Sequence, residues 1–268
     1  MTVALEVIAR ESAGGAGRPP LLFVHGAGHG AWAWDEHFLD YFAGHGFDCS
    51  ALSLRGHGAS GGRERLRWAS IADYASDVAR IASGLPREPV VIGHSMGSRV
   101  LLTYLEEHSA PAAVLLAPPT RAGLLRPSAR MLVDHPWRSL QVILSGRAGR
   151  LIGAPELARK FFFSPELAEE RVREYASRQG SESFRALLEL VCTRPDRARI
   201  RGVPLLVLGA GLDYFVRPSA IRRVAEAYGA ESKILPGLGH GMMLDAAWRE
   251  VADAILEWLE RTLEPESP

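Results

Sequence analysis

The stretch from Pro89 to Gly97 reads PVVIGHSMG and decides the fold. Its first four residues form an apolar run of the kind found in strands covered on both faces, and a helical pattern follows over Ser98–His108. Ser95 therefore stands on a tight turn between a strand and a helix, where Gly93 and Gly97 give the room that such a turn requires. A G-x-S-x-G string alone is a weak signal, but this position makes it specific. The serine hydroxyl is presented at the carboxyl edge of a sheet and at a helix N-terminus, which favours negative charge.

Strand-like and helix-like segments alternate on both sides of this turn. The expected strands are Thr2–Ala9, Leu21–Val24, Phe47–Leu54, Pro89–Ile92, Ala112–Ala117, Pro204–Leu208 and Ser232–Leu235. The expected helices are Ile71–Ala82, Ser98–His108, Pro218–Tyr228 and Ala246–Leu263. Such alternation with buried apolar strands is typical of an α/β fold with a mainly parallel sheet flanked by helices.

The alternation is interrupted once. From Thr120 to about Arg201 the sequence shows helical patterns, at Pro165–Gln179 and Glu182–Cys192, but no convincing strand. We therefore predict a core made of residues 1–118 and 202–268, with residues 119–201 inserted as a helical cap.

Charge and composition exclude several classes of protein. The chain has 268 residues, and 31 Lys and Arg balance 31 Asp and Glu, whereas a nucleic-acid-binding protein has a strongly basic face. No apolar run approaches the roughly 18 residues of a membrane helix, and the N-terminus lacks the apolar stretch of a signal peptide. Cys49 and Cys192 are too few for a disulfide framework. We expect a cytoplasmic monomer or homodimer with no membrane span and no nucleic-acid partner.

A serine hydroxyl is a poor nucleophile unless a base takes its proton, and a carboxylate orients that base. Asp213 follows the expected strand Pro204–Leu208, and His240 follows the last expected strand, so both fall on the same sheet edge as Ser95. The order serine, acid, histidine is the one expected for this topology. Asp245 is a competing acid, but we interpret it as the N-cap of the final helix.

Acyl transfer also requires hydrogen-bond donors for a developing oxyanion. The strand Leu21–Val24 runs into the glycine-rich turn HGAGHG at His25–Gly30. The N–H groups of Ala27 and of Met96, the residue after the serine, are the natural pair of donors, and each such donor is worth about 3 kcal/mol. A dinucleotide site is the alternative interpretation of these glycines, but G-x-G-x-G lacks the G-x-G-x-x-G spacing.

Taken together, these motifs resemble the α/β-hydrolase superfamily. They are HGAGHG after a strand, SLRGHGAS at Ser53–Ser60, GHSMG, the strand end before Asp213 and the GLGH loop that ends at His240. The resemblance extends over nearly the whole chain. It implies an eight-stranded sheet with one antiparallel edge pair, a helical cap after the sixth strand, and a site that uses neither a cofactor nor a metal.

The resemblance also implies a role for each residue of the site. Ser95 is the nucleophile, His240 the base, Asp213 the orienting acid, and Ala27 and Met96 supply the oxyanion donors. Two positions outside this set depart from the family pattern, since Ser53 stands where an Asp is frequent and Ser98 where a second Gly is frequent.

A serine at position 95 argues against the superfamily branches that attack with Asp, namely haloalkane dehalogenases and epoxide hydrolases. The leading expectation is hydrolysis of a small carboxylic ester through an acyl-enzyme. Alternatives with the same triad are a carbon–carbon bond hydrolase and a lyase, because HGAGHGAWAW at His25–Trp34 looks like the opening of the hydroxynitrile lyase branch. A noncatalytic small-ligand receptor remains a further alternative.

The substrate pocket is expected from aromatic and apolar residues around these motifs. Trp32 follows the oxyanion turn, His94 precedes the serine, and Met243 follows the histidine loop. Phe162, in the run FFF, either anchors the cap or lines an apolar mouth.

The cap carries an excess of basic residues. Residues 119–199 hold 14 Arg and Lys160 against nine acids, a balance of +6, so the rest of the chain carries −6. These side chains are either solvated helix faces or a means of drawing in an anionic substrate.

Overall fold

The computed structural model describes residues 3–12, 17–120, 137 and 154–263. Its elements, in chain order, are β1 (Val7–Arg10), β2 (Leu21–Val24), α1 (Trp32–Asp35), α2 (Phe38–Gly44), β3 (Cys49–Leu52), the 3-10 helix η1 (Arg63–Trp68), α3 (Ile71–Ala82), β4 (Val90–His94), α4 (Met96–Tyr104), β5 (Ala113–Leu116), α8 (Pro155–Phe162), α9 (Glu169–Ser177), α10 (Phe184–Cys192), β6 (Leu205–Ala210), α11 (Pro218–Tyr228), β7 (Glu231–Leu235) and α12 (Trp248–Leu263).

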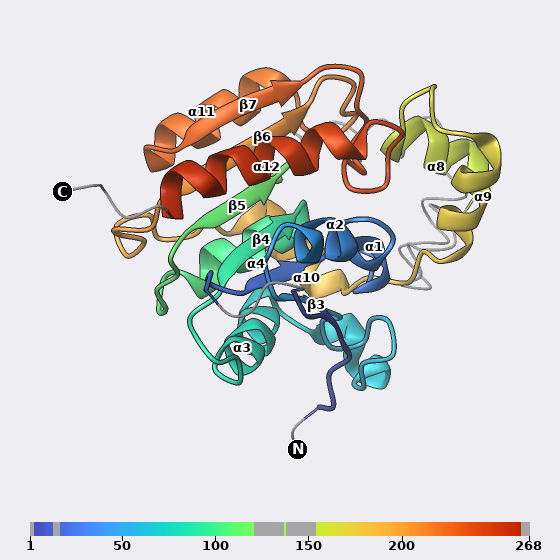
Figure 1. Cartoon of the computed structure of the whole chain (residues 1–268). Coiled ribbons are helices and arrows are strands. Elements are labelled where there is room, and N and C mark those ends of the chain that lie inside the picture. Colours follow the sequence, from blue (N-terminus) through green and yellow to red (C-terminus); the bar gives the residue numbers. More distant parts are fainter. Residues whose placement is uncertain (1–2, 13–16, 121–136, 138–153, 264–268) are drawn as a thin grey trace.

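One mostly parallel sheet organises these elements, in the order β1-β3-β2-β4-β5-β6-β7 (Figure 1). Strands β2 to β7 pair in parallel, and β1 lies antiparallel to β3 at one edge. The α/β fold and the antiparallel edge pair are therefore confirmed.

The expected number of eight strands is wrong for the described residues, which contain seven. The described residues before β2 contain a single strand, β1. The described segment ahead of β1 bonds to a loop. The carbonyl of Ala4 accepts from the Gly61 N–H, and the Glu6 carboxylate accepts from the Ala59 N–H. These bonds hold the segment against the loop that follows β3.

Both faces of the sheet are buried, which explains the continuous apolar runs in the sequence. Alternate residues of β2 point to opposite sides: Leu21 and Phe23 belong to a core cluster with α1, α2 and α12, whereas Leu22 and Val24 pack with α3, α4 and α11. The parallel strands thus end at one common edge between two helical layers.

The described part of residues 119–201 is helical. Helices α8 and α9 contact each other and lie beyond the end of the sheet toward which β7 points (Figure 1). Helix α10 contacts η1, and its buried residues Ala186 and Leu190 join the core cluster on the α3 and α4 side. None of the helices in the described part of the chain is long and apolar enough to cross a membrane.

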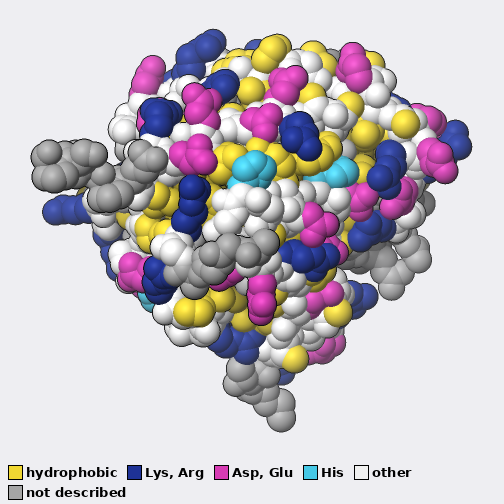
Figure 2. Space-filling model, viewed as in Figure 1, with side chains coloured by type: hydrophobic (Ala, Val, Ile, Leu, Met, Phe, Trp, Pro, Cys, Tyr) yellow, Lys and Arg dark blue, Asp and Glu magenta, His cyan; other side chains and the backbone are white. Residues whose placement is uncertain are grey.

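Most of the described basic side chains of the predicted cap are paired with acids. Arg121, Arg126, Arg130, Arg138, Arg147 and Arg150 lie outside the described residues. Six of the other eight have a carboxylate oxygen within 4 Å: Arg159, Arg171, Arg173, Arg178, Arg185 and Arg199. On the face shown in Figure 2, basic and acidic side chains are likewise interspersed.

Candidate active site

Ser95 lies on the sharp turn between β4 and α4, in a backbone conformation that non-glycine residues rarely adopt (φ 49°, ψ −117°). Its N–H donates to the Leu116 carbonyl at 2.8 Å, which fastens the turn to the neighbouring strand. A Cβ atom on Gly97 would lie 2.3 Å from the Val24 carbonyl oxygen, and one on Gly93 would lie 2.7 Å from the Gly97 carbonyl carbon. The turn therefore requires glycine at both flanking positions.

A chain of two hydrogen bonds links Ser95 to the residues that follow β6 and β7. His240 Nε2 lies 2.9 Å from Ser95 Oγ, and His240 Nδ1 lies 2.8 Å from Asp213 Oδ2. The side chains of His240 and Asp213 are 4% and 0% exposed. The structure thus brings together three side chains that are 27 and 145 residues apart.

The Asp213 carboxylate is oriented by the backbone behind it. Its Oδ1 accepts from the N–H groups of Phe215 at 2.7 Å and Val216 at 2.8 Å, which leaves Oδ2 for His240. These bonds fix the orientation of the carboxylate toward His240. The competing acid Asp245 instead accepts from the N–H groups of Gly239 and Ser164, and α12 begins three residues after it.

The two expected oxyanion donors belong to the serine turn and to the turn that packs on it. Met96 is the first residue of α4, so its N–H is among those at a helix start that have no intrahelical acceptor. Ala27 lies in the turn after β2, and Gly26 packs directly on the serine turn: a Cβ on Gly26 would lie 3.2 Å from Ser95 Cβ. The glycine thus allows the two turns to approach each other.

The four expected pocket residues occupy different places. The Phe162 ring is 5.9 Å from the His240 ring, and Met243 is fully buried in the core cluster of α12. Trp32 lines a cleft of ≈ 680 Å³ together with His29 and Arg178, whose guanidinium carbon is 4.2 Å from the Trp32 ring centroid.

His94, the residue before the serine, is buried and not exposed at the surface of a pocket. It is 1% exposed, and its Nε2 lies 2.8 Å from the His240 carbonyl oxygen, which fits a neutral ring that donates from Nε2. Burial, with a smaller effect of His240, lowers the pKa of His94 well below its ordinary value. This contact holds the backbone of the histidine loop.

Sequence reasoning missed a buried group of hydrogen-bonded residues centred on Glu182. Glu182, which precedes α10, accepts hydrogen bonds from His57 Nε2, from the Tyr74 hydroxyl and from the Gly28 N–H. His57 was expected only as a residue of a turn motif, and Glu182 only as the first residue of a helix, which instead begins at Phe184. Within the described ranges, this cluster included, no group of three or more His, Cys, Asp or Glu side chains is arranged to hold a metal ion.

Known proteins resemble this chain along almost its whole length. A curated relative, a monoacylglycerol lipase of Mycolicibacterium smegmatis, is 25% identical over 260 residues, covering 90% of this chain and 88% of that one.

Similar solved structures share the fold at lower identity. BpoC of Mycobacterium tuberculosis H37Rv superposes with a TM-score of 0.73 at 20% identity, over 98% of this chain and 97% of that one. The esterase RhEst1 from Rhodococcus sp. ECU1013 superposes with a TM-score of 0.68 at 22% identity, over 95% and 94% of the two chains.

The sequence pattern of one family matches residues 21–254, which include the serine turn, Asp213 and the His240 loop. That match covers most of the chain and accords with the parallel sheet and its antiparallel edge strand. The chain belongs to the alpha/beta hydrolase family.

Proposed function

We propose that this protein is a serine hydrolase of carboxylic esters, in which Ser95, His240 and Asp213 form the catalytic triad. The observation that carries the proposal is the continuous chain of hydrogen bonds from Ser95 Oγ through both ring nitrogens of His240 to Asp213. The names of similar proteins, a monoacylglycerol lipase and several esterases, support ester substrates.

The first half of the reaction transfers the acyl group to the enzyme. His240 Nε2 takes the proton of Ser95 Oγ as that oxygen forms a bond to the ester carbonyl carbon. Asp213 keeps the remaining ring proton on Nδ1 and stabilises the imidazolium. The Ala27 and Met96 N–H groups donate to the carbonyl oxygen as it gains negative charge. Collapse of this tetrahedral intermediate expels the alcohol, to which His240 returns the proton.

The second half releases the carboxylic acid. His240 takes a proton from a water molecule, whose oxygen attacks the carbonyl carbon of the acyl-enzyme, and the same two N–H groups stabilise the second intermediate. Ser95 Oγ then leaves and takes the proton from His240. The site is regenerated without a redox step or a cofactor.

A panel of p-nitrophenyl esters of increasing acyl length tests this proposal. We expect the wild type to hydrolyse at least one of them, and Ser95→Ala to lower kcat by about 10⁴-fold or more. Ser76→Ala is a suitable control, because Ser76 is exposed on α3 and its hydroxyl donates to the Ala72 carbonyl of the same helix. Failure of Ser95→Ala to affect hydrolysis would contradict the proposal, and inactivity toward every ester would favour carbon–carbon bond cleavage, lyase chemistry or ligand binding.

A further inference from the structure

Glu182 is a buried carboxylate whose two oxygens are both fully used. Oε2 accepts from the Gly28 N–H at 3.1 Å and from His57 Nε2 at 3.0 Å. Oε1 accepts from the Tyr74 hydroxyl at 2.7 Å and from the Ser183 N–H at 2.6 Å. Four donors satisfy the four acceptor sites that a carboxylate offers. A buried charge with complete, well-directed bonds fixes the positions of its donors.

His57 is the cationic partner of this carboxylate. Its Nδ1 faces the Arg55 carbonyl at 3.1 Å and its Nε2 faces Glu182, so both ring nitrogens have an acceptor and the ring is held as an imidazolium. Burial alone would lower the pKa of His57, but the charge and hydrogen bond of Glu182 outweigh it and raise that pKa. The pair is thus neutral overall inside the protein.

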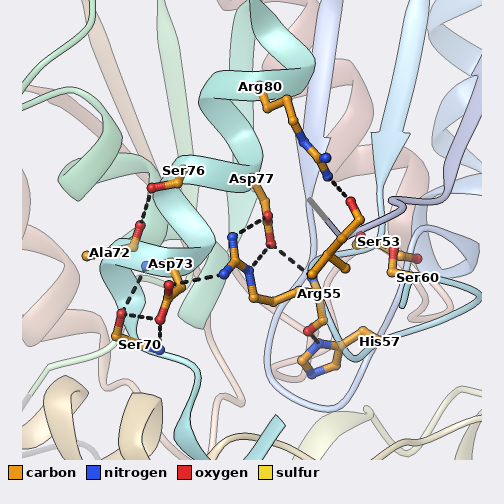
Figure 3. A network of polar contacts seen from close by, with 11 residues as sticks. Ser53, Arg55, His57, Ser60, Ser70, Ala72, Asp73, Ser76, Asp77 and Arg80 are labelled. Carbon is orange, nitrogen blue, oxygen red and sulfur yellow. Dashed lines mark hydrogen bonds and ion pairs between the residues drawn. The ribbon is translucent and has the colours of Figure 1, made fainter. Parts of the chain in front are cut away.

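The loop that carries His57 is itself rigidly held. Figure 3 shows the Arg55 guanidinium between Asp77 and Asp73 of α3. Asp77 also accepts from the Arg55 backbone N–H at 3.0 Å, so the carboxylate holds both ends of the same residue. His57 therefore presents its ring to Glu182 from a fixed point on the body of the protein.

The Gly28 N–H belongs to the peptide group that follows Ala27, the proposed oxyanion donor. The other end of that peptide group, the Ala27 carbonyl, faces His29 Nδ1 at 3.0 Å. Gly28 has φ +72°, and its own carbonyl accepts from the Gly180 N–H at 2.7 Å. Gln179 Nε2 lies 3.0 Å from His29 Nε2, so residues 179–182 contact the turn at three points.

We propose that Glu182 is a positioning residue for the oxyanion turn: by holding the Gly28 N–H, it sets the direction in which the Ala27 N–H points. This inference rests on the proposed function, since it assigns a task to the same site. It goes beyond the triad because Glu182 lies 154 residues from Gly28, in the segment between α9 and α10. The cap segment thereby completes the geometry of a donor that the core supplies.

The predicted kinetic signature is a loss in kcat with little change in KM. A misdirected donor weakens an interaction that forms fully only in the transition state, so substrate binding is spared. Removing one oxyanion donor costs about 10²–10³-fold in kcat, and misdirecting one should cost less. We expect Glu182→Gln to lower kcat by about 10–100-fold.

Glu182→Gln is the sharpest variant because it keeps the size of the side chain but has a single oxygen. Its NH₂ group must face either Gly28 and His57 or Tyr74 and Ser183, and in both cases it meets an N–H donor. Glu189→Gln is the matched control. Glu189 also accepts a core backbone N–H, that of Ile71 at 2.8 Å, but it does not bond to the oxyanion turn.

The test combines ester kinetics with amide hydrogen exchange of Gly28, both at a temperature at which thermal melts show each variant folded. The expected result is a selective fall in kcat and faster Gly28 exchange for Glu182→Gln, with neither change for Glu189→Gln. Unchanged kcat in folded Glu182→Gln would overturn the inference, as would equal kinetic losses in both variants. If the wild type shows no Ser95-dependent hydrolysis, the proposed function fails, and the kinetic role of Glu182 fails with it. Slow exchange of the Gly28 amide in the wild type would still show that its N–H is bonded to Glu182.

Discussion

At the scale of single residues, the proposed reaction depends on which nitrogen of His240 carries the proton in the resting enzyme. Ser95 Oγ can give up its proton only to an unprotonated Nε2, so the ring proton must sit on Nδ1. Asp213 imposes this state, because Oδ1 is occupied by the Phe215 and Val216 N–H groups and Oδ2 faces Nδ1.

Replacing Asp213 by Asn should therefore remove activity while keeping the fold. The Asn oxygen will stay with the two backbone N–H donors, so its NH₂ group will donate to Nδ1 and move the ring proton to Nε2. We expect kcat to fall by about 10⁴-fold, measured by ester hydrolysis, with a thermal midpoint close to that of the wild type. A residual activity within tenfold of the wild type would show that another acid orients His240.

The sequence predicted these three residues because each follows a strand end and the strands are parallel, so position along the chain indicates position in space. The same reasoning could not find Glu182. Its donors His57 and Gly28 are 125 and 154 residues away, and it precedes a helix in a segment without strands. Asp245 was interpreted as a helix cap. Its bonds to the Gly239 and Ser164 N–H groups depend on two segments, the loop after β7 and the chain after α8, that only the fold brings together.

At the scale of secondary-structure elements, the structure depends on close contact between β2 and the turn from β4 to α4. Gly97, in the first turn of α4, packs against the end of β2. Its replacement by Ala would therefore put a methyl group onto the backbone oxygens of Val24 and His25. Backbone atoms in a buried parallel sheet cannot move aside as a flexible side chain can.

Gly97→Ala should accordingly destabilise the protein by about 3 kcal/mol, the upper end of the usual cost of overpacking. Gly44→Ala is the control, because a Cβ at Gly44 in α2 meets nothing within 4 Å and Ala favours helix by about 1 kcal/mol. Urea denaturation measures both free energies of unfolding. Equal stability of the two variants would mean that β2 and the serine turn are less tightly packed than described.

The prediction of elements succeeded where the pattern was long and periodic. Helix α3 was predicted with the residues it occupies, because its sequence has one clear apolar face. The structure adds a capping box at its start, formed by Ser70 and Asp73. The short helices α1 and α2 were missed because their sequence is rich in aromatic residues with no polar face. The prediction of an eighth strand was wrong for the described residues, because it came from the family resemblance and not from a pattern in this sequence.

At the scale of the whole molecule, the buried pair of His57 and Glu182 joins the loop after β3 to the segment before α10, and the stability that the pair contributes depends on pH. Burial alone would raise the pKa of Glu182, but the charge and hydrogen bond of His57 bring that pKa down to about 2. The pKa of His57 is in turn raised. Because its pKa is raised by folding, His57 contributes its full stabilisation of the folded protein below its ordinary pKa of about 6.5. Because its pKa is lowered by folding, Glu182 contributes its full stabilisation above its ordinary pKa of about 4.3. The neighbouring His25 and His29 have pKa values lowered by burial to about 3 and about 4, so both rings are largely neutral near pH 5.5.

The stabilisation should consequently be largest between about pH 4.3 and pH 6.5. It is lost as the pH rises through the pKa of folded His57, or falls toward that of folded Glu182. Breaking a buried pair costs about 3 kcal/mol, so the thermal midpoints of the wild type and Glu182→Gln should differ most near pH 5.5 and less near pH 9. A difference that stays constant over this range would show that His57 is not charged in the folded protein.

The zero net charge of the chain is the sum of a basic predicted cap and an acidic remainder, but most of the described arginines in residues 119–199 are paired with carboxylates. We therefore expect little steering of anionic substrates. Arg194 and Arg197 have no carboxylate within 4.0 Å among the residues that the structure describes, so their replacement by Glu is the strictest test. We expect KM to change less than about twofold for both anionic and neutral esters. A rise in KM confined to anionic esters would show that the cap draws them in.

The central claim is that His240 activates Ser95 as a nucleophile, and covalent labelling tests it most directly. A fluorophosphonate should react with the wild type at a single residue, and peptide mass mapping should place the adduct on Ser95. His240→Ala should slow this labelling by several orders of magnitude, because the hydroxyl then has no base. An adduct on another residue, or labelling of Ser95 at the same rate in His240→Ala, would contradict the account.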